Sequence, residues 1–180
     1  QLLDAGHEVT VYDDLSLGFK ENIDERAKFV NGSTLDLYHL KKSLSDNFDL
    51  VIHLAAYKAA GESMELPSIY SNNNINGSVN LINVMLEHGI KNLIFSSTAA
   101  VYGYPSYLPI DENHALNPIN FYGYTKLVIE NLIQWYAKLG KLNYVIFRFF
   151  NAAGYDAKGR IKRVEQNPAN LLPIIMETAN

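Results

Sequence analysis

The fold is decided by two short apolar stretches, Leu50-Val51-Ile52-His53-Leu54 and Asn92-Leu93-Ile94-Phe95-Ser96. Each is a continuous or nearly continuous apolar run, which is typical of a strand that is buried on both faces of a parallel sheet. A helix is predicted between them, beginning near Pro67 and ending at His88-Gly89, where the glycine fits the position that follows a helix. Two buried strands joined by a helix predict a parallel βαβ unit.

Outward from this unit, strands and helices continue to alternate. Upstream, strands are predicted over residues 8–13 and 28–31, and Asp36 is the predicted N-cap of a helix that runs to about Asp46. Downstream, a polar loop over 104–120 leads to a helix over 122–139, a strand over 144–150 and a short helix over 170–178. We expect Leu127, Val128, Leu132 and Trp135 to form one apolar face of the helix over 122–139. This order predicts an α/β fold with a doubly wound parallel sheet.

The first residues resemble the end of a helix. Gln1 to Ala5 predict its last turns, with Leu2 and Leu3 on the buried side, and Gly6 fits the left-handed position after them. A strand follows at once, so these residues form the second half of a βαβ unit. We therefore expect the first strand of the sheet, with its turn, to precede Gln1, and we interpret the chain as truncated at its N-terminus.

Composition limits the possible functions. The chain has 180 residues, which is the length of one domain, and 48% of them are hydrophobic. The net charge of -4 argues against non-specific nucleic-acid binding, which needs a basic surface. The absence of cysteine excludes a disulfide framework, a thiolate metal site and a cysteine nucleophile. No apolar run approaches the roughly 20 residues that span a bilayer, and we expect a cytoplasmic protein.

A hydroxyl and a Tyr-Lys pair are the sharpest chemical signal. Ser96-Ser97-Thr98 ends a buried strand, where ligands of a parallel sheet bind. Tyr122 and Lys126 stand four residues apart and so share one helix face. A tyrosine with a usual pKa near 10 needs a shift of roughly 3 units to act as a base near neutrality, and an adjacent ammonium supplies part of it. An ordinary helix gives the same spacing often, and Thr98 also fits a plain turn cap.

Further polar residues have two interpretations each. Asp13-Asp14 closes the first predicted strand, where an acid binds the adenine ribose of a dinucleotide and disfavours a 2′-phosphate, or is simply a polar strand end. The histidine at 53 lies inside an apolar strand and is predicted to be a core residue rather than a base. The asparagines at 72–74 bind backbone or cofactor groups, or are surface amides. No metal-ligand spacing is present among the histidines.

Together these segments resemble the extended short-chain dehydrogenase/reductase family, and within it the sugar-nucleotide 4-epimerases. The likeness covers essentially all 180 residues. In two places it is specific: at Lys58 and Glu62, in the segment after the His53 strand, and at Thr98-Ala99-Ala100. After the hydroxyl, Ala99 and Ala100 replace the Asp-Glu pair of the related dehydratases and the glutamate of the related decarboxylases, so neither elimination nor decarboxylation has its acid. The segments that carry the resemblance are Val11–Leu15, His53–Ser63, Asn73–Gly77, Phe95–Gly103, Tyr122–Lys126, Arg148–Asn151 and Asn170–Pro173.

The resemblance implies NAD-dependent interconversion of UDP-galactose and UDP-glucose at C4, through a 4-keto intermediate. It implies that Tyr122, held as phenolate by Lys126, takes the proton of the sugar 4-hydroxyl, with Thr98 bridging. It also implies contacts to NAD from Asp13, Asp14, Ser33, Leu54, Ala55, Ala56, Lys58, Asn73, Tyr122, Lys126 and Phe150. Contacts to the UDP-sugar are implied for Lys58, Thr98, Tyr122, Asn151 and Asn170.

The resemblance also implies a division of the chain and an assembly. Residues 1–150 form a Rossmann-like NAD-binding domain without its first strand, and residues 151–180 begin the substrate-binding region. A homodimer packed through the helices over 67–88 and 122–139 is implied for the full-length protein. Ser33 stands where the family usually has an acidic residue against the adenine amine. A serine can still accept a hydrogen bond from that amine. Without a glycine turn to hold pyrophosphate, we expect the 180 residues alone to bind NAD poorly and to turn over little.

Two other functions fit the same residues. One is another NAD-dependent nucleotide-sugar epimerase or dehydrogenase, for example one that acts on UDP-N-acetyl sugars. The other is a non-catalytic Rossmann-like fragment that keeps the scaffold. The intact Thr98, Tyr122 and Lys126 favour an enzyme.

Overall fold

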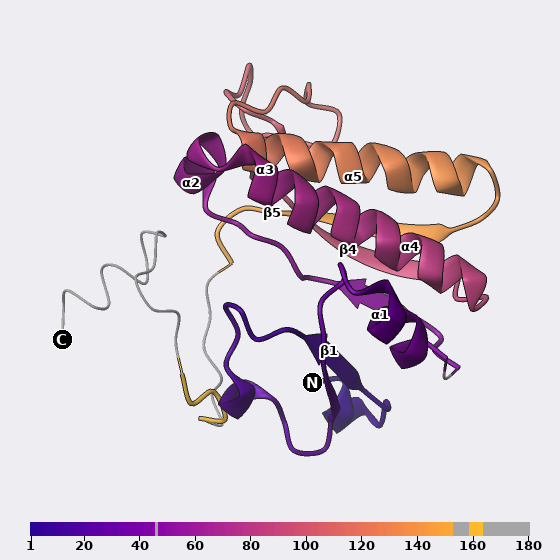
Figure 1. Ribbon diagram of the computed structural model, residues 1–180. Helices are drawn as coiled ribbons and strands as arrows, with labels where there is room; N and C mark the ends of the chain where they lie inside the picture. Colours follow the sequence, from indigo (N-terminus) through magenta and orange to yellow (C-terminus); the bar gives the residue numbers. More distant parts are fainter. Residues whose placement is uncertain (46, 153–158, 164–180) are drawn as a thin grey trace. The chain divides into compact units, whose positions relative to one another are not determined.

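The computed structural model describes residues 1–45, 47–152 and 159–163, and these fall into two units. One unit contains residues 1–33 and the described part of 151–180, and the other contains residues 34–150. The predicted helix over 170–178 lies outside the described residues. Every strand pair that the described residues form is parallel, and helices lie between successive strands of the larger unit (Figure 1), which confirms the α/β fold class.

The smaller unit is built on a two-stranded parallel sheet. Strands β1 (Thr10–Asp13) and β2 (Lys28–Asn31) pair from Thr10 opposite Lys28 to Asp13 opposite Asn31. The short 3₁₀ helices η1 (Leu3–Ala5) and η2 (Lys20–Asn22) lie before and after β1. Gly6 follows η1 with a φ of 87°, in the left-handed region that the sequence predicted for it. Leu2, predicted to be buried, is exposed because η1 buries no residue.

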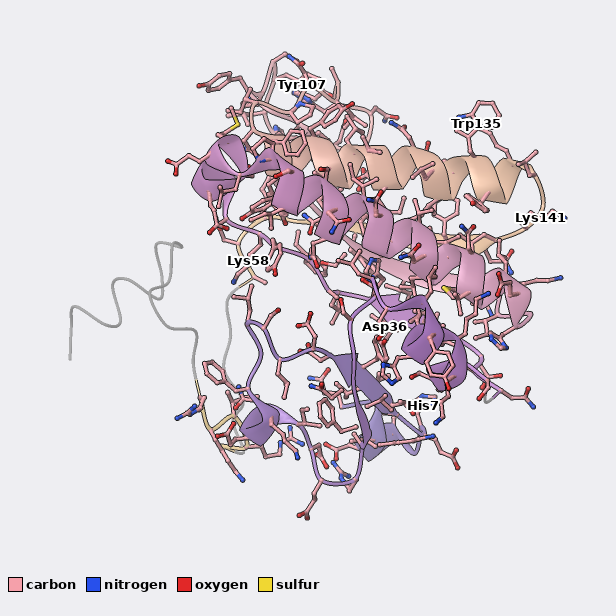
Figure 2. The ribbon with its side chains drawn as sticks, viewed as in Figure 1. His7, Asp36, Lys58, Tyr107, Trp135 and Lys141 are labelled. Atoms are coloured by element: carbon pink, nitrogen blue, oxygen red, sulfur yellow. The ribbon has the colours of Figure 1, made fainter. Side chains whose placement is uncertain are left out.

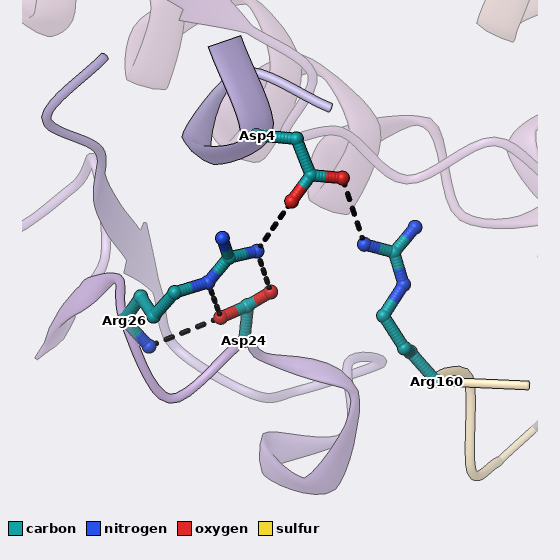
Figure 3. Close-up of polar contacts among 4 residues, drawn as sticks. All are labelled: Asp4, Asp24, Arg26 and Arg160. Atoms are coloured by element: carbon teal, nitrogen blue, oxygen red, sulfur yellow. Dashed lines mark hydrogen bonds and ion pairs between the residues drawn. The ribbon is translucent and has the colours of Figure 1, made fainter. Parts of the chain in front are cut away.

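A surface ion-pair cluster joins the ends of this unit. Arg26 donates to both Asp24 and Asp4, with 2.8 and 2.9 Å between Nη2 and the carboxylate oxygens, and Arg160 reaches Asp4 at 3.2 Å (Figure 3). The side-chain hydrogen bond from Arg26 holds the pKa of Asp24 well below its usual range. Exposed ion pairs of this kind each contribute little to the free energy of unfolding. The pair with Asp4 nevertheless links Arg160 to the first residues of the chain.

The larger unit has a three-stranded parallel sheet with β4 in the middle. Its strands are β3 (Val51–His53), β4 (Asn92–Thr98) and β5 (Asn143–Phe149), in the order β3-β4-β5. Helix α1 (Leu37–Ser43) precedes β3. Asp36 caps it, as predicted, by accepting a hydrogen bond from the backbone N–H of His39. The 3₁₀ helix η4 (Ala99–Val101) extends the chain directly after β4.

Between β3 and β4 the chain forms one interrupted helical run. It consists of α2 (Ala60–Glu65), α3 (Pro67–Tyr70), the π-helical segment η3 (Ser71–Asn76) and α4 (Gly77–Glu87). Helix α5 (Phe121–Lys138) follows the loop after η4 and lies beside this run (Figure 1), and the Tyr136 hydroxyl donates to the Asn83 side chain between them. The apolar core lies where α4 and α5 cover β4, and it includes Leu81, Phe95 and Ile129.

Besides that of Leu2, two further expectations about burial are wrong. Strand β3 is not buried on both faces: Ile52 is exposed because no described helix packs on its side of the strand, whereas His53 is buried against α4. On α5 the buried face holds Thr125, Lys126, Ile129, Glu130 and Ile133 rather than the predicted apolar stripe. Trp135, which belongs to that stripe, is 61% exposed and projects away from the sheet (Figure 2).

Candidate active site

The first turn of α5 meets the end of β4, and the three predicted catalytic residues belong to these two elements. Thr98 is the last residue of β4, and its hydroxyl is close enough to the Tyr122 hydroxyl to lower the pKa of the tyrosine. Lys126 lies one helical turn further along α5, and its Nζ donates to the backbone carbonyl of Ser96 at 2.8 Å. The Thr98 hydroxyl also accepts the N–H of Ala100, so the residue is a turn cap as well.

The beginning of α5 is held by three side chains that accept its first backbone N–H groups. Asn120 is the N-cap and accepts from Gly123 at 2.8 Å. Ser63, buried in α2, accepts from Tyr122 at 2.9 Å, and the sulfur of Met64 accepts from Phe121 at 3.3 Å. These contacts satisfy donors that a helix leaves without an internal partner. They also fix the backbone of the Tyr122 turn against α2.

Burial controls the electrostatics of the pair. Burial raises the pKa of Tyr122, and the hydrogen bond from Thr98 opposes this shift. Burial also lowers the pKa of Lys126 to about 8, because this lysine is only 2% exposed. Its ammonium lies over the ring of Phe95, 4.8 Å from the ring centre, and this contact favours the charged form. A lysine with this pKa carries its charge at neutrality and loses it under mildly basic conditions. Tyr122 and Lys126 lie one turn apart on the same helix, so the two groups are candidates for proton exchange with a bound hydroxyl.

The loop after β3 contains the predicted cofactor residues Leu54, Ala55, Ala56 and Lys58. The amide of the buried Asn74 pins this loop: it accepts from the N–H of Tyr57 and donates to the Tyr57 carbonyl, each at 2.9 Å. Asn74 also donates to the hydroxyl of Thr125 in α5 at 3.2 Å, so the loop is tied to the turn that carries Tyr122. Its neighbour Asn73 donates to the Asn74 side chain and lines an open hollow of about 250 Å³.

Sequence reasoning missed the structural roles of Ser63 and Asn74. Asn74 was only one of three consecutive amides in the sequence, and Ser63 only one residue of a matching segment. The π-helical segment η3, which puts Asn74 under the loop, leaves no periodic signature in sequence. π-Helical turns occur frequently at functional sites.

In the smaller unit, Asp13 is the last residue of β1, and Ser33 comes two residues after the end of the paired strand β2. The Asp13 carboxylate accepts from the N–H of Leu15 at 2.7 Å, and Asp14 accepts from that of Ser16 at 2.9 Å. The Tyr12 hydroxyl donates to the Ser33 carbonyl at 3.0 Å. The two acids thus shape the turn after β1.

The remaining predicted residues are less closely grouped. Phe150 follows β5 in the larger unit, is 63% exposed and stacks on Tyr102, with 6.4 Å between ring centres. Asn151 belongs to the other unit. Asn170 lies outside the described residues. His53 is a core residue, as predicted: its Nε2 is 2.8 Å from the Ser78 hydroxyl, and burial lowers its pKa to about 3.

Over the part of the chain that the structure describes, no group of three or more acidic or histidine side chains could hold a metal ion. No helix there is long and apolar enough to cross a membrane.

Comparison with known proteins shows the family to which this chain belongs. Residues 1–180 match the model of the NAD dependent epimerase/dehydratase family. The UDP-glucose 4-epimerase of Lactobacillus helveticus is 38% identical over 180 residues, which is 99% of this chain and 54% of that protein. A structure of the Brucella ovis UDP-glucose 4-epimerase in complex with NAD superposes with a TM-score of 0.94 at 39% identity, over 99% of this chain and 55% of that one.

The corresponding protein of Bifidobacterium longum, solved with NAD+ and UDP, gives a TM-score of 0.93 at 31% identity, over 99% of this chain and 56% of that one. The chain therefore spans about half the length of the relatives that it matches. The likeness covers β4, α5 and the loop after β3, so it includes every element of the junction described above.

Proposed function

Because this chain belongs to the NAD dependent epimerase/dehydratase family, we propose that it carries the catalytic part of a nucleotide-sugar 4-epimerase. The substrates that we propose are UDP-glucose and UDP-galactose, as in the names of its relatives. One observation carries the proposal: Thr98, Tyr122 and Lys126 converge at the end of β4, and Ala99 and Ala100 leave no acid beside them for elimination.

The side chains at the strand ends suit NAD. Leu54 and Phe150, after β3 and β5, are 66% and 63% exposed, so flat apolar surface is available for an aromatic ring. Ala55 and Ala56 are small enough to let a ligand approach the backbone. Asp13, the last residue of β1, has the carboxylate that a ribose diol requires. We propose that these residues, with Asp14, Ser33, Lys58 and Asn73, hold NAD, which supplies a hydride acceptor and donor for C4 of the sugar.

In the proposed mechanism, Tyr122 takes the proton of the sugar 4-hydroxyl through the hydroxyl of Thr98. Lys126 stabilises the phenolate, and its ammonium has N–H donors beyond the one that Ser96 accepts. When C4 is reduced again from its other face, Tyr122 returns the proton to the new hydroxyl. The sugar keeps its atoms and its oxidation state, and only the configuration at C4 changes.

The rest of the proposal concerns the whole protein. We propose that residues 1–150 bind NAD, that residues 151–180 begin the substrate-binding part with Asn151 and Asn170 on the UDP-sugar, and that the protein is cytoplasmic. A homodimer through the helical run from α3 to α4 and through α5 is also proposed, and Ile69 of α3 with Tyr124 and Trp135 of α5 are exposed side chains with apolar surface. Trp135→Glu should dissociate such a dimer in sedimentation equilibrium.

The catalytic proposal is tested by converting UDP-galactose in the presence of NAD and following the sugar by proton NMR. The chain is assayed as it is, and also grafted into the Lactobacillus helveticus enzyme in place of the 180 aligned residues. Tyr122→Phe should lower the rate by about 10²- to 10⁴-fold. Tyr124→Phe, on the same helix turn but half exposed, is the control and should leave the rate unchanged. Equal rates for both variants would exclude Tyr122 as the base, and conversion of UDP-N-acetylgalactosamine alone would change the substrate.

A further inference from the structure

A buried carboxylate on α5 has no part in the proposed chemistry. Glu130 is 0% exposed and lies two helical turns beyond Tyr122. Its Oε1 accepts the hydroxyl proton of Ser97 and the Nε–H of Arg148, the latter at 3.1 Å. Its Oε2 accepts from the Nη2 of Arg148 at 2.7 Å. The carboxylate thus joins α5 to both β4 and β5.

Arg148 continues this connection toward the predicted cofactor side of the sheet. Its Nη1 donates to the hydroxyl of Tyr102 at 3.1 Å, and its guanidinium lies 5.0 Å from the centre of the Tyr102 ring. Tyr102 in turn stacks on Phe150, at an interplanar angle of 27°. The hydrogen bond to Glu130 raises the pKa of Arg148, so the guanidinium stays charged. A continuous chain of contacts therefore runs from Glu130 to Phe150.

The contacts of Glu130 belong to a regular set between β4 and α5. Three consecutive residues of β4 each interact with one residue of α5, and the α5 residues are spaced by four. The Ser96 carbonyl accepts from Lys126, the Ser97 hydroxyl donates to Glu130, and the Thr98 hydroxyl lowers the pKa of Tyr122. Apolar side chains would fill the same space at least as favourably as a buried ion pair, so the polar contacts serve to fix a position.

We propose that Glu130 is a positioning residue, which sets the register of α5 against β4 through Ser97 and holds Phe150 through Arg148 and Tyr102. This inference rests on the proposed function only in assigning the chemistry to Tyr122 and Lys126. Loss of the Glu130 contacts should let α5 slide or tilt, so that the Lys126 ammonium leaves the Ser96 carbonyl and its dry environment. The base and the ring that faces the cofactor would then lose their relative placement.

The test uses the unliganded chain, so it does not depend on any enzymatic activity. Lysine labelled with ¹³C at Cε is titrated by NMR, and the Lys126 signal is assigned from Lys126→Met. In the unchanged chain this lysine should titrate near 8. In Glu130→Gln its pKa should rise by about one unit or more, because the ammonium regains water. Removal of a negative charge without movement would lower the pKa, so the sign of the shift separates repositioning from electrostatics.

Two further variants keep the test decisive. Ser97→Ala leaves the ion pair intact and removes one link to β4, and it should raise the pKa of Lys126 by a smaller amount. Glu87→Gln, which alters an exposed ion pair with Lys41, is the matched control and should change nothing. An unchanged or lowered pKa in both Glu130→Gln and Ser97→Ala would overturn the inference. If the pKa rises as expected but Tyr122→Phe leaves epimerisation intact, the positioning role stands and the proposed function fails.

Discussion

The ammonium of Lys126 donates a hydrogen bond to the backbone carbonyl of Ser96, with 2.8 Å between Nζ and the oxygen. Ser96 belongs to β4, the strand that α5 covers. The two residues are thirty positions apart in sequence. Because this contact is buried, it costs the folded protein part of the solvation of a charge. Burial of this lysine therefore lowers the free energy of unfolding, and the size of this effect can be measured by replacing the lysine.

Lys126→Met should make the chain more stable at neutral pH. The pKa of Lys126 is lowered to about 8 in the fold, so the unfolded chain binds more protons between pH 8 and the ordinary lysine value of 10.5. The free energy of unfolding of the unchanged chain should rise with pH over that window. Below pH 8 the penalty is about 3 kcal/mol, so the variant should gain about 1–2 kcal/mol after loss of one hydrogen bond.

Urea unfolding of both proteins at pH 7 and at pH 9.5 checks this expectation. The difference in unfolding free energy should shrink at the higher pH. Lys138→Met, at the exposed end of the same helix, is the control. A difference that is the same at both pH values would show that the Lys126 ammonium is not desolvated.

Gly123→Ala should displace the beginning of α5. A Cβ at this position would stand 2.7 Å from the backbone oxygen of Ala100, which cannot move aside as a side chain could. We expect a loss of about 1–3 kcal/mol in unfolding free energy and a loss of the Thr98–Tyr122 contact. In the grafted enzyme the rate should fall at least about tenfold, since a small displacement costs much in catalysis.

Gly61→Ala is a matched control for that change. Gly61 lies in the first turn of α2, and a Cβ there would meet nothing within 4 Å. Alanine is the better helix former, so this variant should be neutral or more stable by up to about 1 kcal/mol. Equal losses in the two variants would mean that the close approach of α5 to η4 is unimportant.

Acidification should destabilise the chain through His53. Burial, with a smaller contribution from the Lys126 charge, lowers the pKa of His53 to about 3, so the unfolded chain takes up a proton below pH 6.5 that the folded chain refuses. The stability present above pH 6.5 should therefore fall toward pH 3, at about 1.4 kcal/mol per pH unit for this group. His53→Asn should show a flatter profile in that range, whereas His39→Gln, at an exposed position, should keep the slope of the unchanged chain.

Breaking one side of the Glu130–Arg148 pair should cost more than replacing both. Arg148→Met leaves a carboxylate buried without its partner, and we expect a loss of about 3–5 kcal/mol in unfolding free energy. The double variant Glu130→Leu with Arg148→Met should recover most of that loss. A double-mutant cycle by urea unfolding measures the coupling, and additive losses would argue against a strong pair.

The elements that local sequence could predict are those with a local cause. Asp36 caps α1 because its own side chain reaches the third N–H of the helix, and Gly89 ends α4 because its φ of 75° suits glycine. Thr98, Tyr122 and Lys126 were also predicted together, since strand ends and helix periodicity are local properties. The structure pairs the Thr98 and Tyr122 side chains and sets Lys126 against the Ser96 carbonyl of the same strand, whereas the catalytic roles of the three residues remain proposals.

The errors have non-local causes. Trp135 was assigned to a buried apolar stripe, but the α5 face that packs on the sheet holds Lys126 and Glu130, whose partners come from β4 and β5. No count of apolar residues along one helix can show that a charged residue will meet its partner on another element. Ile52 was expected to be covered because its neighbours are apolar, yet covering depends on a helix elsewhere in the chain.

The position of Tyr122 on α5 has one more consequence. The residue lies in the first turn of an 18-residue helix, and the aligned peptide dipoles of a helix place about half a positive charge at that end. A phenolate at Tyr122 would thus be stabilised by the backbone of its own helix, in addition to the ammonium of Lys126. Helix α5 therefore has two effects on the reacting hydroxyl: it holds the side chain in place, and the positive end of its dipole favours the ionised form.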